Sequence, residues 1–294
     1  MTVVITALLV ITGAIPAHAL TTDASTALES ITAVDPGALA LTVGVSETAE
    51  SLTASSGHAR IAVPTEARDG ISLQISSQSL AITLPFANQA NKGVVERAGV
   101  MSFDNNNGSV TVPIVKTDGS VQINTVISRP DAPNHYRYGL DLPTGSLIRP
   151  EGGGFLLFDA SGENIGAIAA PWAFDATGKA VPTRYEVSGT TITQVVDHSA
   201  EFQYPIVADP TYIAPITIIY SRADVERMWN VMNFTGSACK FAPLPYLASL
   251  ACAAPATLAD AVASAHYQKK RIKALYYQCN SGSWCNYYTY KIIS

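Results

Sequence analysis

Short turn sequences recur through the middle of the chain at intervals that leave room only for short strands between them. Asp and Asn side chains accept hydrogen bonds from their own turns, and Gly tolerates positive φ, so such sequences join neighbouring strands into hairpins. The turns are Asn107-Gly108, Asp118-Gly119, the tetrads 159–162 and 175–178, and Ser188-Gly189. The strands predicted between them span residues 110–115, 121–127, 136–142, 155–158, 165–169, 185–187 and 191–196.

Apolar and polar residues also alternate with a period of two before the first of these turns. This period places one side of a strand on a core and the other side in water. The alternating apolar residues are Ile71, Leu73, Ile75, Leu80, Ile82 and Leu84. With the turns, they predict an antiparallel β-sandwich or barrel-like domain over residues 61–210. We expect Trp172 to pack in its core rather than to stack on a ligand.

Two motifs in this region resemble a known group of proteins. The first is Pro171-Trp172-Ala173 with the turn 175–178, and the second is the run Tyr-Pro-Ile-Val-Ala-Asp-Pro-Thr from Tyr204 to Thr211. They resemble a segment of uncharacterised secreted proteins of high-GC Gram-positive bacteria. A similar Tyr-Pro-x-x-x-Asp-Pro-Thr run closes a β-rich module in large surface proteins of those organisms. The resemblance covers roughly residues 100–290 and implies export and a β-rich class, without an established activity or site residues.

The N-terminus has the pattern of an export signal. Residues 3–15 are mostly apolar and uncharged, and Ala17-His18-Ala19 supplies the small residues that signal peptidase needs. We expect cleavage near Ala19 and a secreted, extracellular product. No Lys or Arg precedes the apolar run, so the true translation start lies upstream or the signal is weak; the alternative is a buried N-terminal strand or helix. Residues 20–60 are expected to form a short helix and a linker.

Charge divides the chain into two unequal parts. Residues 211–294 carry eight Lys and Arg against three Asp and Glu, a net charge of +5, and the remainder carries −10. The overall content of 48% hydrophobic and 14% charged residues excludes a disordered chain. Opposite charges on successive segments predict that the two dock on one another, or that the basic segment faces an anionic cell-envelope polymer or membrane surface. No nucleic-acid partner is expected, and the oligomeric state stays open.

All four cysteines lie in the basic segment 211–294: Cys239, Cys252, Cys279 and Cys285. In an exported protein this predicts disulfide bonds that staple a small, α-rich C-terminal module, which makes the expected fold class α+β. Pairing of Cys239 with Cys252 and of Cys279 with Cys285 is the first hypothesis, although four cysteines permit three pairings. A metal site is not expected, because the spacings lack paired two-residue gaps, and no cofactor is predicted.

Two helices and a terminal hairpin are predicted in this module. Ser221 followed by Asp224 resembles a capping box at the start of the first helix, with Met228 and Trp229 on its apolar side. Pro255 suits the first turn of a second helix. Its apolar side is traced through Leu258, Ala261, Val262, Ala265, Ile272 and Tyr276. Turn residues between two aromatic runs predict the hairpin, which a bond between Cys279 and Cys285 would clip.

Bases and aromatic rings of the same module form the candidate binding surface. They are Lys269, Lys270, Arg271, Lys273, Trp284, Tyr287, Tyr288 and Tyr290. Exposed rings beside bases suit glycans or a membrane surface, whereas buried rings are packing. A solvated helical face is the alternative explanation for the bases.

No catalytic residues are predicted, because the common hydrolase, metalloprotease and phosphate-loop motifs are missing. Residues 197–199 contain the three residue types of a hydrolytic triad, but neighbours on a strand point to opposite faces. His135 and His198 are the best acid–base candidates if an enzyme is present. Residues 104–108 are interpreted as a turn, since an EF-hand glutamate is missing. Glu151, Asp159 and Glu163 are carboxylates that could flank a sugar.

Three functional hypotheses follow from these features. The first is a secreted, non-enzymatic protein whose basic module binds the cell envelope or another extracellular polymer. The second makes the module a toxin-like or antimicrobial effector that the acidic domain carries or masks. The third is a secreted hydrolase with an unrecognised site.

Overall fold

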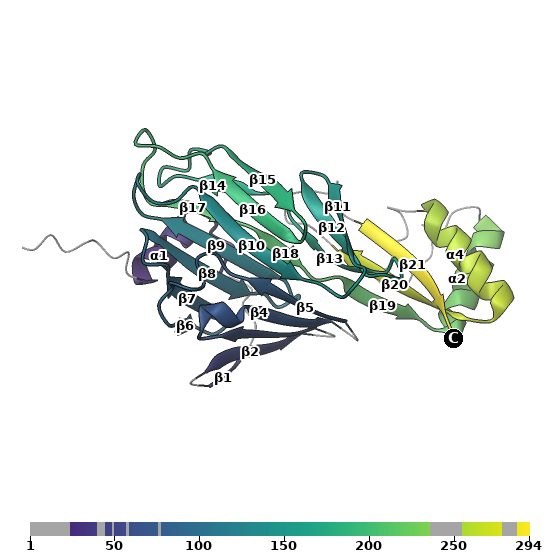
Figure 1. The fold of residues 1–294 in the computed structure, drawn as a ribbon. Helices are drawn as coiled ribbons and strands as arrows, with labels where there is room; N and C mark the ends of the chain where they lie inside the picture. Colours follow the sequence, from purple (N-terminus) through teal and green to yellow (C-terminus); the bar gives the residue numbers. More distant parts are fainter. Residues whose placement is uncertain are drawn as a thin grey trace, which may run out of the picture.

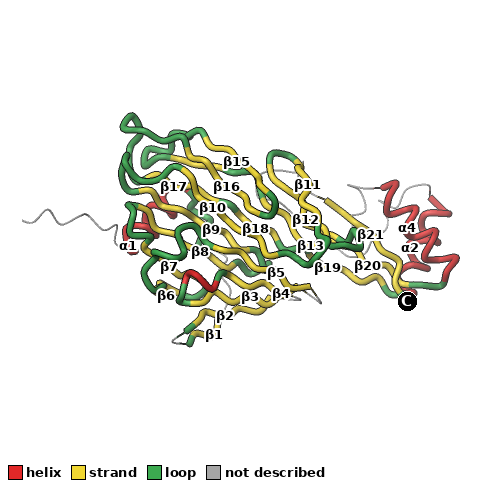
Figure 2. Tube along the Cα trace, in the orientation of Figure 1, coloured by secondary structure: helices red, strands yellow, loops and turns green. Residues whose placement is uncertain are grey.

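Every strand pairing that the structure describes is antiparallel. The computed structural model describes residues 24–39, 45–48, 50–56, 59–75, 78–235, 255–277 and 287–294. These residues form antiparallel β-sheets with a few short helices (Figures 1 and 2). The predicted β-rich class is therefore confirmed, and in this part of the chain neither large sheet closes into a barrel.

The first sheet has eight strands and contains most of the alternating sequence. Its order is β1 (Val45–Glu47), β2 (Ser51–Ser56), β3 (Ala59–Pro64), β4 (Ile71–Ile75), β5 (Gln78–Thr83), β10 (His135–Asp141), β16 (Thr191–Val196) and β15 (Thr183–Ser188). Strands β1 and β2 lie where a linker was expected, so that expectation is wrong for residues 45–56. The short helix expected before them is α1 (Ala24–Val34).

The second sheet has ten strands. Its main order is β11 (Leu147–Glu151), β12 (Gly154–Phe158), β13 (Asn164–Ile168), β18 (Thr211–Ile213), β9 (Val121–Ile127), β8 (Ser109–Val115), β7 (Val100–Asp104) and β6 (Val94–Arg97). Strand β17 (Ile206–Asp209) pairs with β9, and β14 (Trp172–Phe174) pairs with β17. The turns predicted from Asp, Asn and Gly join β7 to β8, β8 to β9, β12 to β13 and β15 to β16.

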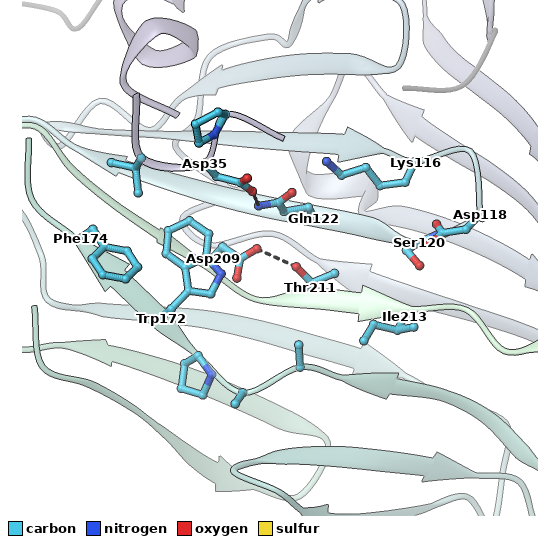
Figure 3. A pocket seen from close by; sticks show the side chains of 15 residues that line it. Asp35, Lys116, Asp118, Ser120, Gln122, Trp172, Phe174, Asp209, Thr211 and Ile213 are labelled. Atoms are coloured by element: carbon cyan, nitrogen blue, oxygen red, sulfur yellow. Dashed lines mark hydrogen bonds between the residues drawn. The ribbon is translucent and has the colours of Figure 1, made fainter. Parts of the chain in front are cut away.

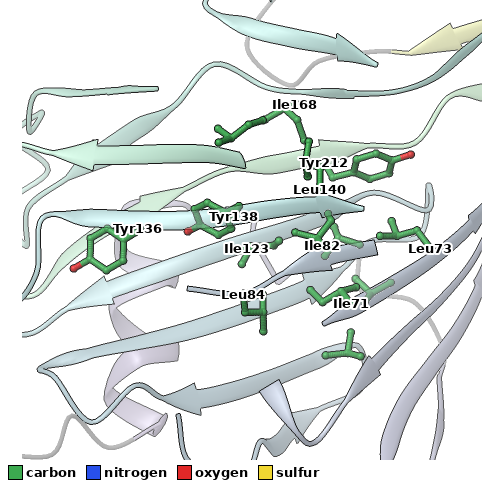
Figure 4. Close-up of a cluster of buried hydrophobic side chains, with 14 of the residues drawn as sticks. Ile71, Leu73, Ile82, Leu84, Ile123, Tyr136, Tyr138, Leu140, Ile168 and Tyr212 are labelled. Atoms are coloured by element: carbon green, nitrogen blue, oxygen red, sulfur yellow. The ribbon is translucent and has the colours of Figure 1, made fainter. Parts of the chain in front are cut away.

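The two large sheets share one hydrophobic core, which Figure 4 shows in close-up. Tyr136 and Tyr138 of β10 in the first sheet contribute to this core together with Ile123 of β9 in the second. Tyr212 is also buried there, and its hydroxyl donates a hydrogen bond to the carbonyl of Ile165 at 2.6 Å. The hydroxyl's partner lowers the cost of burying so large a polar ring.

Helix α1 covers part of the outer face of the second sheet. Ala27 and Ile31 are fully buried and pack with Val112 and Val126 of β8 and β9. Strands β8 and β9 are consequently buried along their whole length on both faces. The two large sheets and α1 are called the β body below.

A smaller unit follows the β body and is called the C-terminal module. Its described elements are β19 (Ile216–Tyr220), α2 (Arg222–Thr235), α4 (Pro255–Gln268), β20 (Arg271–Tyr277) and β21 (Tyr287–Ile293), with the strands in the order β19-β20-β21. Val225 of α2 and Val262 of α4 pack with Ile272 of β20, so the helices share a core with the sheet. The predicted capping box is confirmed, since the Asp224 amide donates to Ser221 Oγ at 3.2 Å and the Ser221 amide donates to the Asp224 carboxylate at 2.8 Å.

The second module helix is shorter than predicted. It ends at Gln268, Lys269 has φ of 54°, and the Lys270 amide donates to the carbonyl of Ala265 at 2.9 Å. This is the left-handed C-terminal cap of a helix. Ile272 and Tyr276 therefore belong to β20, where pairing with both β19 and β21 overrides the helical spacing. The basic run lies at a helix–strand turn rather than on a helical face.

Some predicted features fall outside the described residues. These are the export signal at 1–19, Cys239, Cys252, Cys279, Cys285 and Trp284. The antiparallel pairing of β20 with β21 agrees with the terminal hairpin. No described helix combines the length and the apolar composition that a membrane crossing requires.

Close packing at Gly166 supplies a test of the body core. A Cβ built on Gly166 would lie 2.6 Å from the Tyr212 hydroxyl, whereas one on Gly139 would lie no closer than 3.4 Å to its neighbours. We expect Gly166→Ala to lower the free energy of unfolding by about 2 kcal/mol, because the tyrosine must move. Urea denaturation measures this. Equal losses for Gly166→Ala and the control Gly139→Ala would contradict the packing argument.

Candidate functional site

Four bases gather at one end of the C-terminal module. Strand β19 ends at Tyr220, which pairs with Ile272 of β20, so the start of α2 and the start of β20 lie together. This places Arg222 beside the turn that carries the other three bases. We call Arg222, Lys269, Lys270 and Arg271 the cationic end. All four residues are exposed, and in Figure 1 this end points away from the β body.

The cationic end has few local counter-charges. Arg271 donates from Nε to the backbone carbonyl of Ser294 at 2.9 Å. Within the described residues, Arg222, Lys269 and Lys270 form no ion pair. The adjacent carboxylate of Asp224 is held by its cap and by Arg227, and these contacts lower its pKa. The surface potential at this end is therefore positive.

An exposed aromatic ring lies next to these bases. Tyr267 is 75% exposed and precedes the basic turn by two residues. Its ring contacts Trp229 edge-on at 5.4 Å, and Trp229 stacks on His266 at 4.5 Å. Tyr267 is not among the binding residues predicted from the sequence, although its position off the apolar side of the helix predicts its exposure.

Two other predicted binding residues, Lys273 and Tyr290, do not belong to this exposed group. Lys273 is mostly buried and pairs with Glu163 of the β body at 2.5 Å. Tyr290 is partly buried against the module core, as the packing alternative expected. The backbones of Tyr287 and Tyr288 lie in β21. Among the members of the predicted set whose side chains the structure describes, only Lys269, Lys270 and Arg271 are brought together in an exposed position.

Glu163 also connects the β body to the module. It follows the Asp159 turn between β12 and β13 and lies 2.5 Å from Lys273 Nζ and 3.3 Å from Lys291 Nζ. One of the two consequences predicted from the charge division, contact between the acidic and basic parts, is thus present. The Glu163 carboxylate is committed to this contact rather than to a sugar site.

The other sequence candidates have structural partners. His198 Nδ1 lies 2.8 Å from the Tyr204 hydroxyl, and its Nε2 lies 3.2 Å from the carbonyl of Pro133. His135 contacts Asn134, its neighbour in sequence, at 2.6 Å. Asp159 Oδ1 accepts hydrogen bonds from the backbone of its own turn, which lower its pKa although burial opposes the change. Glu151 lies near Arg149 on the exposed strand β11.

A second candidate site lies on the outer face of the ten-stranded sheet beside α1 (Figure 3). It is a cavity of about 450 Å³. Apolar residues form one wall, and polar residues from the segment after α1, the β8–β9 turn, β9, β17 and β18 form the other. The apolar wall comprises Ala169, Ala170, Pro171, Trp172, Phe174 and Ile213. Trp172 is thus partly buried against the cluster that includes α1, and its side chain also lines a cavity.

Asp209 is the most unusual residue of this cavity. It is fully buried, and its Oδ2 accepts a hydrogen bond from Thr211 at 2.6 Å. Its Oδ1 is buried and has no hydrogen-bond partner among the described residues. Burial raises the pKa of the Asp209 carboxyl to about 7, although the Thr211 bond opposes the rise. A buried carboxyl that titrates near neutrality in a cavity is typical of a functional site.

Further polar groups line the same wall as Asp209. Gln122 donates to Asp35 at 3.2 Å, which ties the sheet to the segment after α1. Lys116 donates to the carbonyl of Ala38, and its burial lowers the pKa of its ammonium although Asp35 and Asp209 attract it. Asp118 stands at the β8–β9 turn, where it accepts from the Ser120 amide at 2.8 Å.

Comparisons with known proteins do not supply a function. No family model matches this chain, and no curated protein matches it in sequence. Across the described residues, His, Cys, Asp and Glu side chains do not cluster in threes that could hold a metal ion. Function is therefore inferred from the geometry of these two sites.

The contact between body and module predicts a measurable coupling. In a double-mutant cycle of Glu163→Gln and Lys273→Gln, we expect a coupling free energy of about 1 kcal/mol in urea unfolding, because the pair is largely shielded from water. A matched cycle of Glu151→Gln with Lys273→Gln should give a value near zero. Equal coupling in both cycles would show that the Glu163 contact is not formed in solution.

The buried carboxyl predicts how stability depends on pH. Below about pH 7 the folded protein keeps Asp209 protonated, whereas an unfolded chain ionises it above about pH 4. Folding takes up a proton between these values, so the free energy of unfolding decreases as pH rises through this range. Asp209→Asn keeps a neutral side chain and should therefore gain stability over the parent from pH 5 to pH 8, by on the order of 2 kcal/mol.

Urea unfolding at several pH values measures this gain. The control is Asp141→Asn, which changes an exposed carboxyl. Parallel stability profiles for the parent and Asp209→Asn would show that Asp209 is ionised throughout this pH range.

Proposed function

We propose that this protein is an exported, non-enzymatic binding protein whose C-terminal module holds an anionic polymer of the cell envelope through its cationic end. The observation that carries the proposal is the convergence of Arg222 and the turn 269–271 at the free end of the module. Export is supported by the N-terminal sequence and by the clustering of cysteines in residues 239–285.

Charge density favours a polymer over a single small anion. The four bases project from two different segments and are exposed, and no described cavity encloses them. An open group of cations gives weak binding to one anion, whereas a polyanion engages several charges at once and releases the counterions that it had condensed. The exposed Tyr267 ring adds an apolar surface for the sugar or polyol units between the charges.

Disulfide bonds of the module belong to the same proposal. In the first of the three possible pairings, bonds of Cys239 with Cys252 and of Cys279 with Cys285 would close loops on either side of α4. Each is expected to stabilise the module by about 2–4 kcal/mol in the loop-entropy account. Such staples suit a unit whose core is one small cluster between two helices and three strands.

A second candidate function is favoured by the Glu163 contact. An acidic body that pairs with Lys273 and Lys291 would also suit a carrier that masks part of a toxin-like or antimicrobial module. In that case Glu163→Gln would release growth inhibition of susceptible bacteria that the parent protein does not cause.

Retention on immobilised polyglycerol phosphate tests the main proposal. We expect the full chain to bind at about 50 mM NaCl and to elute as salt approaches about 0.5 M, where screening is strong. Arg222→Gln combined with Lys270→Gln should weaken binding several-fold and reduce the slope of log Kd against log salt by about 2, since two charge contacts are lost.

The matched control removes the same charge from the β body. Lys92→Gln combined with Arg97→Gln changes two exposed bases there and should leave retention unchanged. Loss of retention with this control, or no retention of the parent at low salt, would contradict the proposal. Binding to phosphatidylglycerol vesicles in place of the polymer would assign the cationic end to a membrane surface instead.

A further inference from the structure

The cavity beside α1 is lined by an apolar wall and an acidic wall that meet at Trp172 and Asp209, which are directly paired on β14 and β17. The Trp172 indole is the largest part of the apolar wall. The acidic wall holds the carboxylates of Asp35, Asp118 and Asp209 and a single ammonium, that of Lys116. The lining therefore has a net negative charge when all its groups are ionised, which disfavours an anionic ligand.

Asp209 leaves an acceptor unused at this wall. Its Oδ2 binds Thr211, whereas Oδ1 has no donor among the described residues. The side chain is fully buried and lines the cavity. A buried oxygen without a donor costs about 1–3 kcal/mol, more if it is charged, and this cost is recovered when a ligand supplies the donor.

Lys116 does not supply that donor. Its ammonium is bonded to the carbonyl of Ala38, in the segment that follows α1. Gln122 is likewise engaged, with Asp35 at 3.2 Å and Asn124 at 3.3 Å. Gln122 also contacts the Asp209 carboxyl closely enough to lower its pKa, against the larger effect of burial, and the buried Tyr185 hydroxyl near Asp209 has no hydrogen-bond partner among the described residues.

We propose that this cavity binds a small organic cation, a primary amine on a compact apolar body, whose ammonium donates to Asp209 Oδ1 while the body packs on the Trp172 indole. An ammonium satisfies the free acceptor and balances the excess of carboxylates, and an indole face attracts a cation as well as its hydrocarbon. A cavity of about 450 Å³ lies within the size range of small-molecule sites. This site lies on the β body and does not depend on the function proposed for the module.

Benzylamine is the probe for this site, and benzyl alcohol is its uncharged counterpart of similar shape. Titration followed by the indole N–H resonance of Trp172, identified with Trp172→Phe, should show benzylamine binding at about millimolar concentration. We expect benzyl alcohol to bind at least about tenfold more weakly, because it has no charge to pair with Asp209. Glucose, a neutral polyol, should leave the resonance unchanged.

Binding should also depend on pH. Titratable groups around Asp209 come from every element packed near it: Asp35 after α1, Lys116 and Asp118 at the β8–β9 junction, and Tyr138 and Tyr185 of the opposite sheet. Burial raises the pKa of the Asp209 carboxyl to about 7, so this group changes charge within the neutral range. Benzylamine should bind about tenfold more tightly at pH 8 than at pH 5.5, because its ammonium pairs with the ionised carboxylate.

Three variants make the assignment specific. Asp209→Asn should weaken benzylamine binding at pH 8 at least about tenfold, and Lys116→Met should strengthen it several-fold because a competing cation is removed. The control Asp141→Asn alters an exposed carboxyl on β10 and should change nothing. The affinity of Lys116→Met for benzylamine can be measured, and the proposal tested, even if Asp209→Asn does not fold.

Several outcomes would overturn the proposal. They are equal binding of benzylamine and benzyl alcohol, unchanged affinity in Asp209→Asn, weaker binding in Lys116→Met, or a response of Trp172 to glucose but not to benzylamine. The last result would assign the cavity to a neutral sugar.

Discussion

Burial of strand β9 on both of its faces is the constraint on which the β body depends. Its inner face carries Val121 and Ile123 into the core between the two sheets, and its outer face is covered near one end by α1. The outer face also carries the buried polar residues Gln122 and Asn124. Buried polar groups must find partners or carry a free-energy cost of about 1–3 kcal/mol each. The polar side chains on the outer face of β9 therefore contribute to the polar wall of the cavity.

Asp209 is buried for the same reason, because the strands beside β9 are also covered on their outer face. β17 and β18 keep one register along β9, from Ala208 opposite Thr125 to Thr211 opposite Gln122. Asp209 falls between these pairs, on the outer face that Val207 shares with α1. Burial of a hydrophobic residue at this position would cost less free energy. Packing alone therefore does not explain why a carboxyl stands here with one oxygen that accepts no hydrogen bond.

The sequence predicted the local structure better than the sites. Hairpin turns and strands such as 121–127 and 191–196 were predictable because their Asp, Asn and Gly residues act within a few positions. Asp175 shows the mechanism: its Oδ1 accepts from the Thr177 and Lys179 amides of its own turn, at 2.9 and 3.0 Å. The capping box of Ser221 with Asp224 was predictable for the same reason.

Features set by distant partners were not predictable in this way. Helical spacing after Pro255 continues into Ile272, but pairing with β19 and β21 makes that residue part of a strand. Strand β9 is buried on both sides, so its alternation does not show which residues face the core and which face α1. The cavity joins Asp35, Trp172 and Asp209 from three separate parts of the chain. Asp209 is part of the Asp-Pro-Thr motif recognised in the sequence. The chemistry of its carboxyl, however, depends on neighbours that are distant in sequence and close only in the folded chain.

The division of charge along the chain thus has two different structural consequences. At Glu163 the acidic and basic parts neutralise one another locally, and this contact fixes the module on the body. Beyond the contact, each part keeps an unbalanced site of its own sign: exposed bases on the module and a buried carboxyl in the body. Charge left exposed costs little in water, whereas charge left buried must be protonated or paired. The two sites therefore differ in kind, the first suited to a polymer that covers a surface and the second to a small molecule that enters a cavity.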